Sequence, residues 1–282
     1  MSRVFDALRR ANPNLISYPE PPGDSSDCLT QIMATVNGEA PAPEDVPRFQ
    51  IPQDEETRLV AWNDPKCLAA ENLRVLTARL RDARQRRSLK PLLITSAICG
   101  EGKTVTSANL AITLALHGEK VLLIDGDFHQ PALSRIFGIR DERGLANWHE
   151  STEPIAGLLK SAEGLPLWLL PAGVCSQQPL HVIQSQQTAE LLKQLSDWFS
   201  WIVIDSPPLV PLADSRTWAA MSDAFLLVTR QGFTPKKAFM KGLATLDRSK
   251  LFAVVINEAT ATEERYFRAY YSGKAASNGA SK

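Results

Sequence analysis

Five short apolar runs, separated by longer mixed segments, constrain the fold of this 282-residue chain more than any other feature. They are PLLITSA (91–97), KVLLIDGD (120–127), WIVIDSPP (201–208), AFLLVTR (224–230) and LFAVVIN (251–257). Nearly every position in these runs is apolar, which is typical of strands that are buried on both faces. Helical patterns over 104–118, 188–199 and 235–247 lie between the runs. We therefore predict an α/β fold in which helices cover both faces of a mostly parallel sheet.

The composition argues against several classes of protein. The net charge is zero, so the chain as a whole has no attraction for nucleic acid. No run of about 18 apolar residues could span a membrane, and MSRVFDALRRANPN lacks the apolar core of a signal peptide. The four cysteines show no metal-binding spacing and are interpreted as free thiols. We therefore expect a cytoplasmic protein.

The N-terminal region differs from the rest in composition. Residues 2–11 can form a short amphipathic helix, either a frayed helical end or a docking helix for a partner. Residues 12–57 contain eight prolines, nine acidic residues and one basic residue, Arg48, which indicates a disordered linker. We therefore expect a flexible extension over 1–57, a folded domain over 58–262 and a C-terminal tail over 263–282.

The segment TSAICGEGKT, which follows the first apolar run and precedes a helix, predicts a phosphate-binding loop. Gly100 and Gly102 let the backbone approach an anion, and the helix N-terminus adds positive potential. Lys103 can reach the terminal phosphates of a nucleotide, and the Thr104 hydroxyl can ligate Mg²⁺. Ala97 replaces the first glycine of the usual pattern, at little cost if its backbone suits an L-residue. The predicted nucleotide contacts are Cys99, Gly100, Glu101, Gly102, Lys103, Thr104 and Val105.

Aspartates end two of the other apolar runs. Asp125 and Asp127 follow VLLI, and Asp205 follows WIVI. Ligands of parallel sheets bind at the carboxyl ends of the strands, where the loop also lies. Carboxylates there suit Mg²⁺, directly or through water, because this ion prefers oxygen ligands. The chain therefore carries the parts of a magnesium–nucleotide site.

The loop, the LLIDGD run and the IVIDSPP run, in this order, resemble the bacterial tyrosine kinases of the wider MinD/ParA group of P-loop ATPases. The resemblance extends from about Leu68 to Tyr271. AAENLRVLTARL resembles the helix that helps to close a ring of subunits in that family, with Glu71 and Arg74 at the matching positions. VVIN ends in Asn257, where relatives often contact adenine. The fold that the resemblance implies is that of a P-loop NTPase.

The C-terminal tail contains three of the four tyrosines of the chain, Tyr266, Tyr270 and Tyr271. Glycine, serine and lysine surround them, so we do not expect them in a core. The resemblance implies that they are autophosphorylated, in trans, by a neighbouring subunit. It also implies ATP and Mg²⁺ as cofactors and an activating membrane partner, the chain-length regulator of a capsule or exopolysaccharide system. Such a protein would lie at the inner face of the membrane through that partner, and a cognate tyrosine phosphatase would reverse its reaction.

The resemblance assigns roles to the catalytic residues Lys103, Asp125, Asp127 and Asp205. Lys103 would hold the β- and γ-phosphates. Thr104 and Asp205 would hold Mg²⁺ with the assistance of Asp125. Asp127 would orient the incoming tyrosine hydroxyl or accept its proton.

Three positions depart from the family pattern. His129 replaces an arginine that follows the second acidic segment, and Thr77 replaces the second arginine of the ring helix. Ile98 stands where partitioning ATPases carry a signature lysine, which favours the kinase over a MinD-type mechanism. Two alternatives to the kinase stay open: a MinD/ParA-like ATPase and, because of His129 and Thr77, a catalytically weak scaffold that binds nucleotide on a membrane protein.

Overall fold

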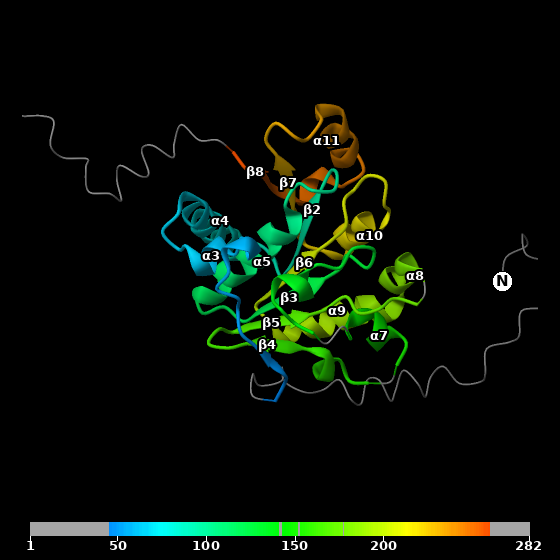
Figure 1. Cartoon of the computed structure of the whole chain (residues 1–282). Helices are drawn as coiled ribbons and strands as arrows, with labels where there is room; N and C mark the ends of the chain where they lie inside the picture. Colours follow the sequence, from blue (N-terminus) through cyan, green and yellow to red (C-terminus); the bar gives the residue numbers. More distant parts are fainter. Residues whose placement is uncertain (1–44, 141–142, 152, 177, 260–282) are drawn as a thin grey trace, which may run out of the picture. The chain divides into compact units, whose positions relative to one another are not determined.

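An eight-stranded sheet forms the centre of the computed structural model, which describes residues 45–140, 143–151, 153–176 and 178–259 (Figure 1). The strands are β1 (Arg48–Phe49), β2 (Pro91–Ser96), β3 (Val121–Asp125), β4 (Lys160–Ala162), β5 (Leu167–Leu170), β6 (Trp201–Asp205), β7 (Ala224–Arg230) and β8 (Leu251–Asn257). Their order across the sheet is β1-β4-β5-β3-β6-β2-β7-β8. Neighbouring strands are parallel except β4 and β5, which confirms the predicted fold class.

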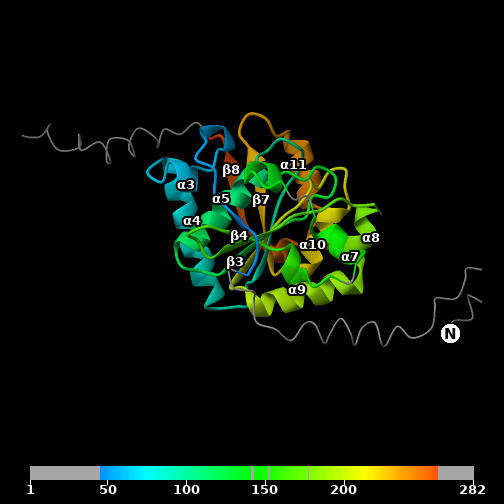
Figure 2. The same cartoon turned by 60° about the horizontal axis from the view of Figure 1, so that its bottom comes forward.

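Helices cover both faces of this sheet, as Figures 1 and 2 show. The α-helices are α3 (Val60–Asn63), α4 (Leu68–Arg84), α5 (Lys103–Leu116), α6 (Leu133–Ile136), α7 (Leu145–His149), α8 (Pro179–Gln184), α9 (Gln186–Trp198), α10 (Asp214–Met221) and α11 (Lys236–Leu243). Short 3₁₀ turns lie at Glu55–Thr57, Ile155–Leu158 and Arg248–Lys250. Among the described residues, no helix combines the length and the apolar character that crossing a membrane requires.

The strands are apolar because side chains on both of their faces are buried. In β2, Leu92 and Ile94 pack in the core beneath α4 and α5, whereas Leu93 packs in the core beneath α8, α9 and α10. All three side chains are fully buried. Each contributes roughly 1.5–3 kcal/mol relative to an exposed position, before the entropic cost of folding.

Residues 45–57 pack against the domain, although the sequence analysis assigned them to the linker. Val46, Phe49 and Ile51 are buried, and β1 pairs with β4 at the edge of the sheet. The expected domain start at 58 is therefore too late. The sequence did not reveal this burial, because three apolar residues among prolines and acids give no clear periodicity. The burial depends instead on pairing with β4, a strand distant in sequence. The predicted helix over 2–11, residues 12–44 and the tail tyrosines lie outside the described residues.

The region between β3 and α9 contains elements that the sequence analysis left unassigned. These are α6, α7, β4, β5 and α8, none longer than six residues. Such short elements carry too few repeats of either period to be recognised. By contrast, the long α5, predicted over 104–118, ends at Leu116, and Gly118 follows with φ of 80°, a conformation that favours glycine after a helix.

Candidate functional site

The carboxyl ends of β3, β6 and β2 lie side by side, because β6 pairs with both of the other strands. Asp125 and Asp205 are direct partners in the register of β3 and β6. The loop after β2 begins one strand further along the sheet. The topology therefore brings together the three segments that the sequence analysis selected.

The loop after β2 has the backbone conformation of an anion-binding turn. Gly100 and Gly102 have φ of 83° and 89°, in the left-handed region that favours glycine. A Cβ atom on Gly102 would lie 2.0 Å from Nδ2 of Asn257, whose side chain donates to the carbonyl of Glu101 at 3.1 Å. Ala97 is not among the described residues with positive φ, so its replacement of glycine causes no strain.

Glu101, predicted to contact nucleotide, has its side chain inside the protein. The carboxylate is fully buried, and its Oε2 accepts from the backbone N–H of Ile98 at 2.6 Å. The Thr234 hydroxyl donates to Oε1. The Glu101 carboxylate thus links the two ends of the loop to the segment after β7. Thr234 was not selected from the sequence, since a single threonine after a strand carries no distinguishing pattern.

Lys103, the first residue of α5, lies between two carboxylates. Its Nζ is 3.0 Å from Oδ2 of Asp127 and 3.9 Å from Oδ2 of Asp205, and it donates to Thr104 Oγ1 at 3.3 Å. Burial alone would lower the pKa of Lys103, but Asp205 and Asp127 outweigh it and raise this pKa above its ordinary value. Lys103 is therefore charged at neutral pH and available to bind phosphate oxygens.

Asp205 is the most enclosed acid of the site. Its Oδ1 accepts from the Ser107 hydroxyl at 3.1 Å, whereas its Oδ2 has no hydrogen-bond partner among the described residues. Burial raises the pKa of Asp205, opposed chiefly by the nearby Lys103 ammonium. A buried carboxylate oxygen without a partner is the kind of group that a hard cation would satisfy.

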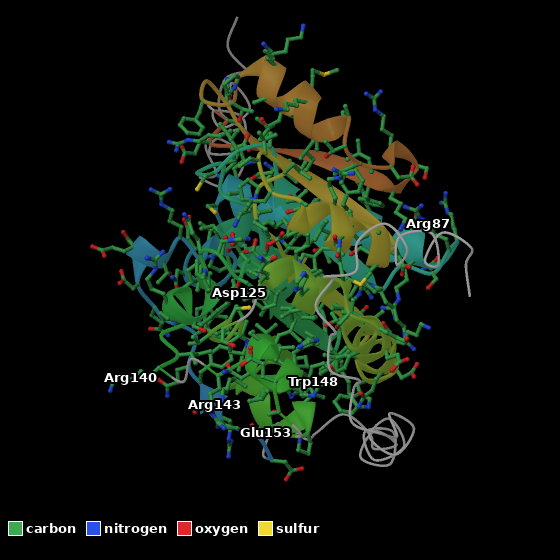
Figure 3. All side chains as sticks on the ribbon, turned by 90° about the vertical axis from the view of Figure 1, so that its right-hand side faces the viewer. Arg87, Asp125, Arg140, Arg143, Trp148 and Glu153 are labelled. Atoms are coloured by element: carbon green, nitrogen blue, oxygen red, sulfur yellow. The ribbon has the colours of Figure 1, made fainter. Side chains whose placement is uncertain are left out.

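Asp125 organises the loop that follows β3. Its Oδ1 accepts from the N–H of Asp127 at 3.3 Å, and its Oδ2 accepts from the N–H groups of Ala132 and Leu133, each at 3.0 Å. Burial and the neighbouring Asp205 raise the pKa of Asp125 to about 7. Figure 3 shows Asp125 in the middle of the domain. Backbone N–H groups thus engage both oxygens of Asp125 and tie it to the loop after β3, whereas its assistance to Mg²⁺ stays a prediction.

No group of three or more His, Cys, Asp or Glu side chains suited to a metal occurs in the part of the chain that the structure describes. The donor set predicted from the sequence included one threonine and two aspartates. Two of them, Thr104 and Asp205, lie beside Lys103 at the loop, and their role as Mg²⁺ ligands stays a prediction.

Asp127 is held by the backbone that follows it and by a neighbouring pair. Its Oδ1 accepts from the N–H groups of His129 and Gln130 at 3.2 and 3.0 Å. Nε2 of His129 lies 2.7 Å from Oδ2 of Asp214, the buried first residue of α10. The Asp214 carboxylate therefore fixes the segment that positions Asp127. The sequence analysis did not select Asp214, although this acid follows the IVIDSPP run by only a few residues.

The remaining predicted residues lie on the surface or at the mouth of the loop. Cys99 is exposed, with its Sγ 3.8 Å from Oε1 of Gln130. On α4, Glu71 and Arg74 form an ion pair with a 2.6 Å separation. Thr77, one turn further, is fully buried.

A strand–loop–helix with buried acids at neighbouring strand ends defines a P-loop nucleotide-binding protein. The family model of the CobQ/CobB/MinD/ParA nucleotide binding domain matches residues 92–268. The tyrosine-protein kinase YwqD of Bacillus subtilis (strain 168) is 30% identical over 205 residues, which cover 72% of this chain and 86% of YwqD. The tyrosine-protein kinase CpsD of Streptococcus pneumoniae serotype 4 is 32% identical over 181 residues, 63% of this chain and 80% of CpsD.

Solved structures show the same relationship. The kinase domain of VpsO is 31% identical, with a TM-score of 0.62, and the match covers 71% of this chain and 100% of that domain. The kinase domain of the Escherichia coli tyrosine kinase ETK, at 22% identity and a TM-score of 0.67, shares the fold. The chain belongs to the MinD/ParA family of nucleotide-binding proteins and, within it, to the bacterial tyrosine-protein kinases.

Proposed function

We propose that this chain is an ATP-dependent protein-tyrosine autokinase that regulates the polymerisation and export of a capsule or exopolysaccharide. The observation that carries the proposal is Lys103, held between Asp127 and Asp205 beside a glycine loop. Phosphoryl transfer depends mainly on positioning and on neutralising charge, and these residues supply both. The acceptors are Tyr266, Tyr270 and Tyr271 in the tail of a second copy.

In this reaction the phenolic oxygen of a tyrosine attacks the γ-phosphorus of ATP. The bond between that phosphorus and the β–γ bridging oxygen breaks, and ADP leaves with its electron pair. Lys103 and the loop N–H groups hold the β- and γ-phosphates. A phenol ionises near pH 10, so Asp127 accepts its proton as the new bond forms. The Lys103 ammonium lies 3.0 Å from Oδ2 of Asp127 and so holds this carboxylate beside the phosphate loop.

The site fits a magnesium ion as well as a nucleotide. Asp205 offers a buried oxygen without a hydrogen-bond partner among the described residues, and Thr104 offers a hydroxyl beside it. When bound there, Mg²⁺ would neutralise charge on the phosphate oxygens. We assign Asp125 to holding the loop that carries Asp127, since backbone N–H groups engage both of its oxygens.

Assembly and regulation complete the proposal. Glu71 and Arg74, a half-buried ion pair on α4, would contribute to contacts between subunits in a ring. A membrane chain-length regulator would activate the kinase and hold it at the inner face of the membrane. Each phosphate added to the tail brings roughly −1.5 to −2 charges at neutral pH, so several would repel one another and loosen the ring. A tyrosine phosphatase would restore it.

The test is to incubate the full chain with labelled ATP and Mg²⁺, alone and with the cytoplasmic segment of a candidate membrane partner. Label on the tail should disappear in Lys103→Met and in a variant with all three tail tyrosines changed to phenylalanine. Release of phosphate without protein label would instead identify an ATPase. ATP binding without either product, even with the partner segment, would identify a scaffold.

A further inference from the structure

A groove of about 440 Å³ lies at the edge of the sheet, between residues 47–52 and 137–140. We call it the β1 groove. Four strands separate β1 from β2, so at about 4.8 Å per strand the groove is roughly 24 Å from the strand that leads into the nucleotide loop. Its volume is in the range of pockets that hold small ligands or single side chains. The β1 groove has no role in the phosphoryl transfer described above.

The inner wall of the β1 groove is apolar and aromatic. Phe49 and Phe137 pack edge to face, with ring centroids 5.3 Å apart, and both are buried. Ile139 and the prolines 47 and 52 extend the apolar surface toward the rim. Such a wall accepts the ring of an aromatic side chain.

The rim of the β1 groove is basic. Arg48 and Arg140 are both exposed, and among the described residues neither guanidinium has an ion-pair or hydrogen-bond partner. Lys160 is a third cation in the lining, buried and engaged in an interaction of its own. Of the described residues that line the groove, none is acidic. Two exposed guanidinium groups at one groove suit the oxygens of a phosphate, which arginine binds in a bidentate manner.

We propose that the β1 groove binds a phosphotyrosine side chain, with the phosphate between Arg48 and Arg140 and the ring against the apolar wall. The inference rests on the proposed function, because that reaction places phosphotyrosine on the C-terminal tail. The groove is thus a docking site for the product of the kinase, distinct from the site that makes it.

The ligand comes from a second copy of the chain. β8, which leads into the tail, and β1 are the opposite edges of the sheet, about 34 Å apart over seven strand spacings. Tyr266 lies seven residues beyond the last described residue, 259, so an extended chain carries it about 24 Å. Tyr270 and Tyr271, which an extended chain carries about 37 and 41 Å, would need a nearly straight path across the whole width of the sheet. Docking therefore occurs in trans and joins one copy to another at the β1 groove, a contact separate from the ring contacts on α4 that tail phosphorylation loosens.

The experiment uses synthetic peptides of residues 263–274, with and without phosphate on Tyr270, and the full chain carrying Lys103→Met. The peptide carries its phosphate from the start, so binding does not depend on kinase activity. Fluorescence anisotropy gives the dissociation constants. We expect the phosphopeptide to bind at least about tenfold more tightly than the unmodified peptide. We expect Arg48→Gln and Arg140→Gln each to weaken it about tenfold, and the pair to abolish the preference.

Arg87→Gln is the matched control, since this arginine is also exposed and lies on the other side of the domain from Arg140 in Figure 3. It should leave the affinity unchanged, and thermal melting should show that all variants fold. Equal binding of both peptides would overturn the proposal, as would equal losses in Arg87→Gln and Arg140→Gln. Equally tight binding of an acidic peptide of residues 18–44 would also overturn it, because charge alone would then explain the affinity. None of these outcomes bears on whether the chain transfers phosphate, which the labelled-ATP test decides separately.

Discussion

Replacing Gly102 by alanine should weaken nucleotide binding through two separable causes. The backbone at Gly102 has φ of 89°, which costs an L-residue roughly 1–2 kcal/mol. The new Cβ would also lie 2.0 Å from Nδ2 of Asn257, so the asparagine must move and lose its 3.1 Å hydrogen bond to the Glu101 carbonyl. That bond contributes about 1 kcal/mol. The sum, about 2–3 kcal/mol, corresponds to an affinity for ATP roughly 30- to 150-fold weaker.

A double-mutant cycle separates these causes. Asn257→Ala alone removes this hydrogen bond, together with the one that Asn257 Oδ1 accepts from the Glu258 N–H, and should weaken ATP binding about fivefold. The double variant should lose about as much ATP-binding free energy as Gly102→Ala alone, because Gly102→Ala already breaks the hydrogen bond that Asn257→Ala removes. The coupling energy is therefore about 1 kcal/mol, well above the deviation of independent sites. Titration of a fluorescent ATP analogue measures all four constants.

Gly118→Ala is the matched control for backbone strain. Gly118 has φ of 80°, but a Cβ there would meet no atom within 4 Å. It should lower the melting temperature without changing the affinity for ATP. If the losses from Gly102→Ala and Asn257→Ala simply add, the asparagine does not brace the loop and this reasoning is wrong.

Four further variants test other parts of the structure. Burial raises the pKa of Asp125 to about 7 from 3.8, so its contribution to stability is complete below about pH 4 and is lost as the pH rises through 7. Without nucleotide and Mg²⁺, the melting temperature of the unaltered chain should therefore fall more between pH 5 and 8 than that of Asp125→Asn. Parallel curves of melting temperature against pH would contradict the raised pKa of Asp125. Phe49→Ala should lower the free energy of unfolding by about 3–5 kcal/mol in urea titrations, and a loss below 1 kcal/mol would mean that residues 45–57 do not belong to the core. Asp214→Asn should lower the kcat of autophosphorylation severalfold with little change in the affinity for ATP. His129→Arg should preserve activity, because the arginine can pair with Asp214. If kinetic assays find His129→Arg less active than Asp214→Asn, the pair does not position Asp127.

The central strands and the phosphate loop could be predicted because their signals are local. A strand buried on both faces must be apolar at almost every position, and a loop between strand and helix needs glycine where the backbone turns toward an anion. The grouping of Asp125 with Asp205 also followed from the sequence, since parallel strands end at one edge of the sheet. These features depend on residues that lie close together in the chain.

The features that the sequence did not reveal depend on contacts between distant segments. Phe49 is buried only because β1 pairs with a strand more than a hundred residues away. The position of Glu101 in the loop predicted a nucleotide contact, but its carboxylate accepts hydrogen bonds from Ile98 and Thr234 inside the domain. The sequence suggested no role for His129, whereas in the structure its ring lies against the Asp214 carboxylate of α10. Such pairings follow from tertiary structure, and no local pattern encodes them.

The central claim is that the site around Lys103 in one copy phosphorylates the tail of another. The most direct measurement mixes two chains that each lack one half of the reaction. One carries Lys103→Met and keeps its tyrosines, and the other keeps Lys103 but has phenylalanine at positions 266, 270 and 271. After incubation with ATP, Mg²⁺ and any activating partner segment, mass spectrometry should find phosphotyrosine on the tail of the Lys103→Met chain and none when either chain is alone. An unmodified tail in the mixture, under conditions where the unaltered chain is phosphorylated, would contradict the account.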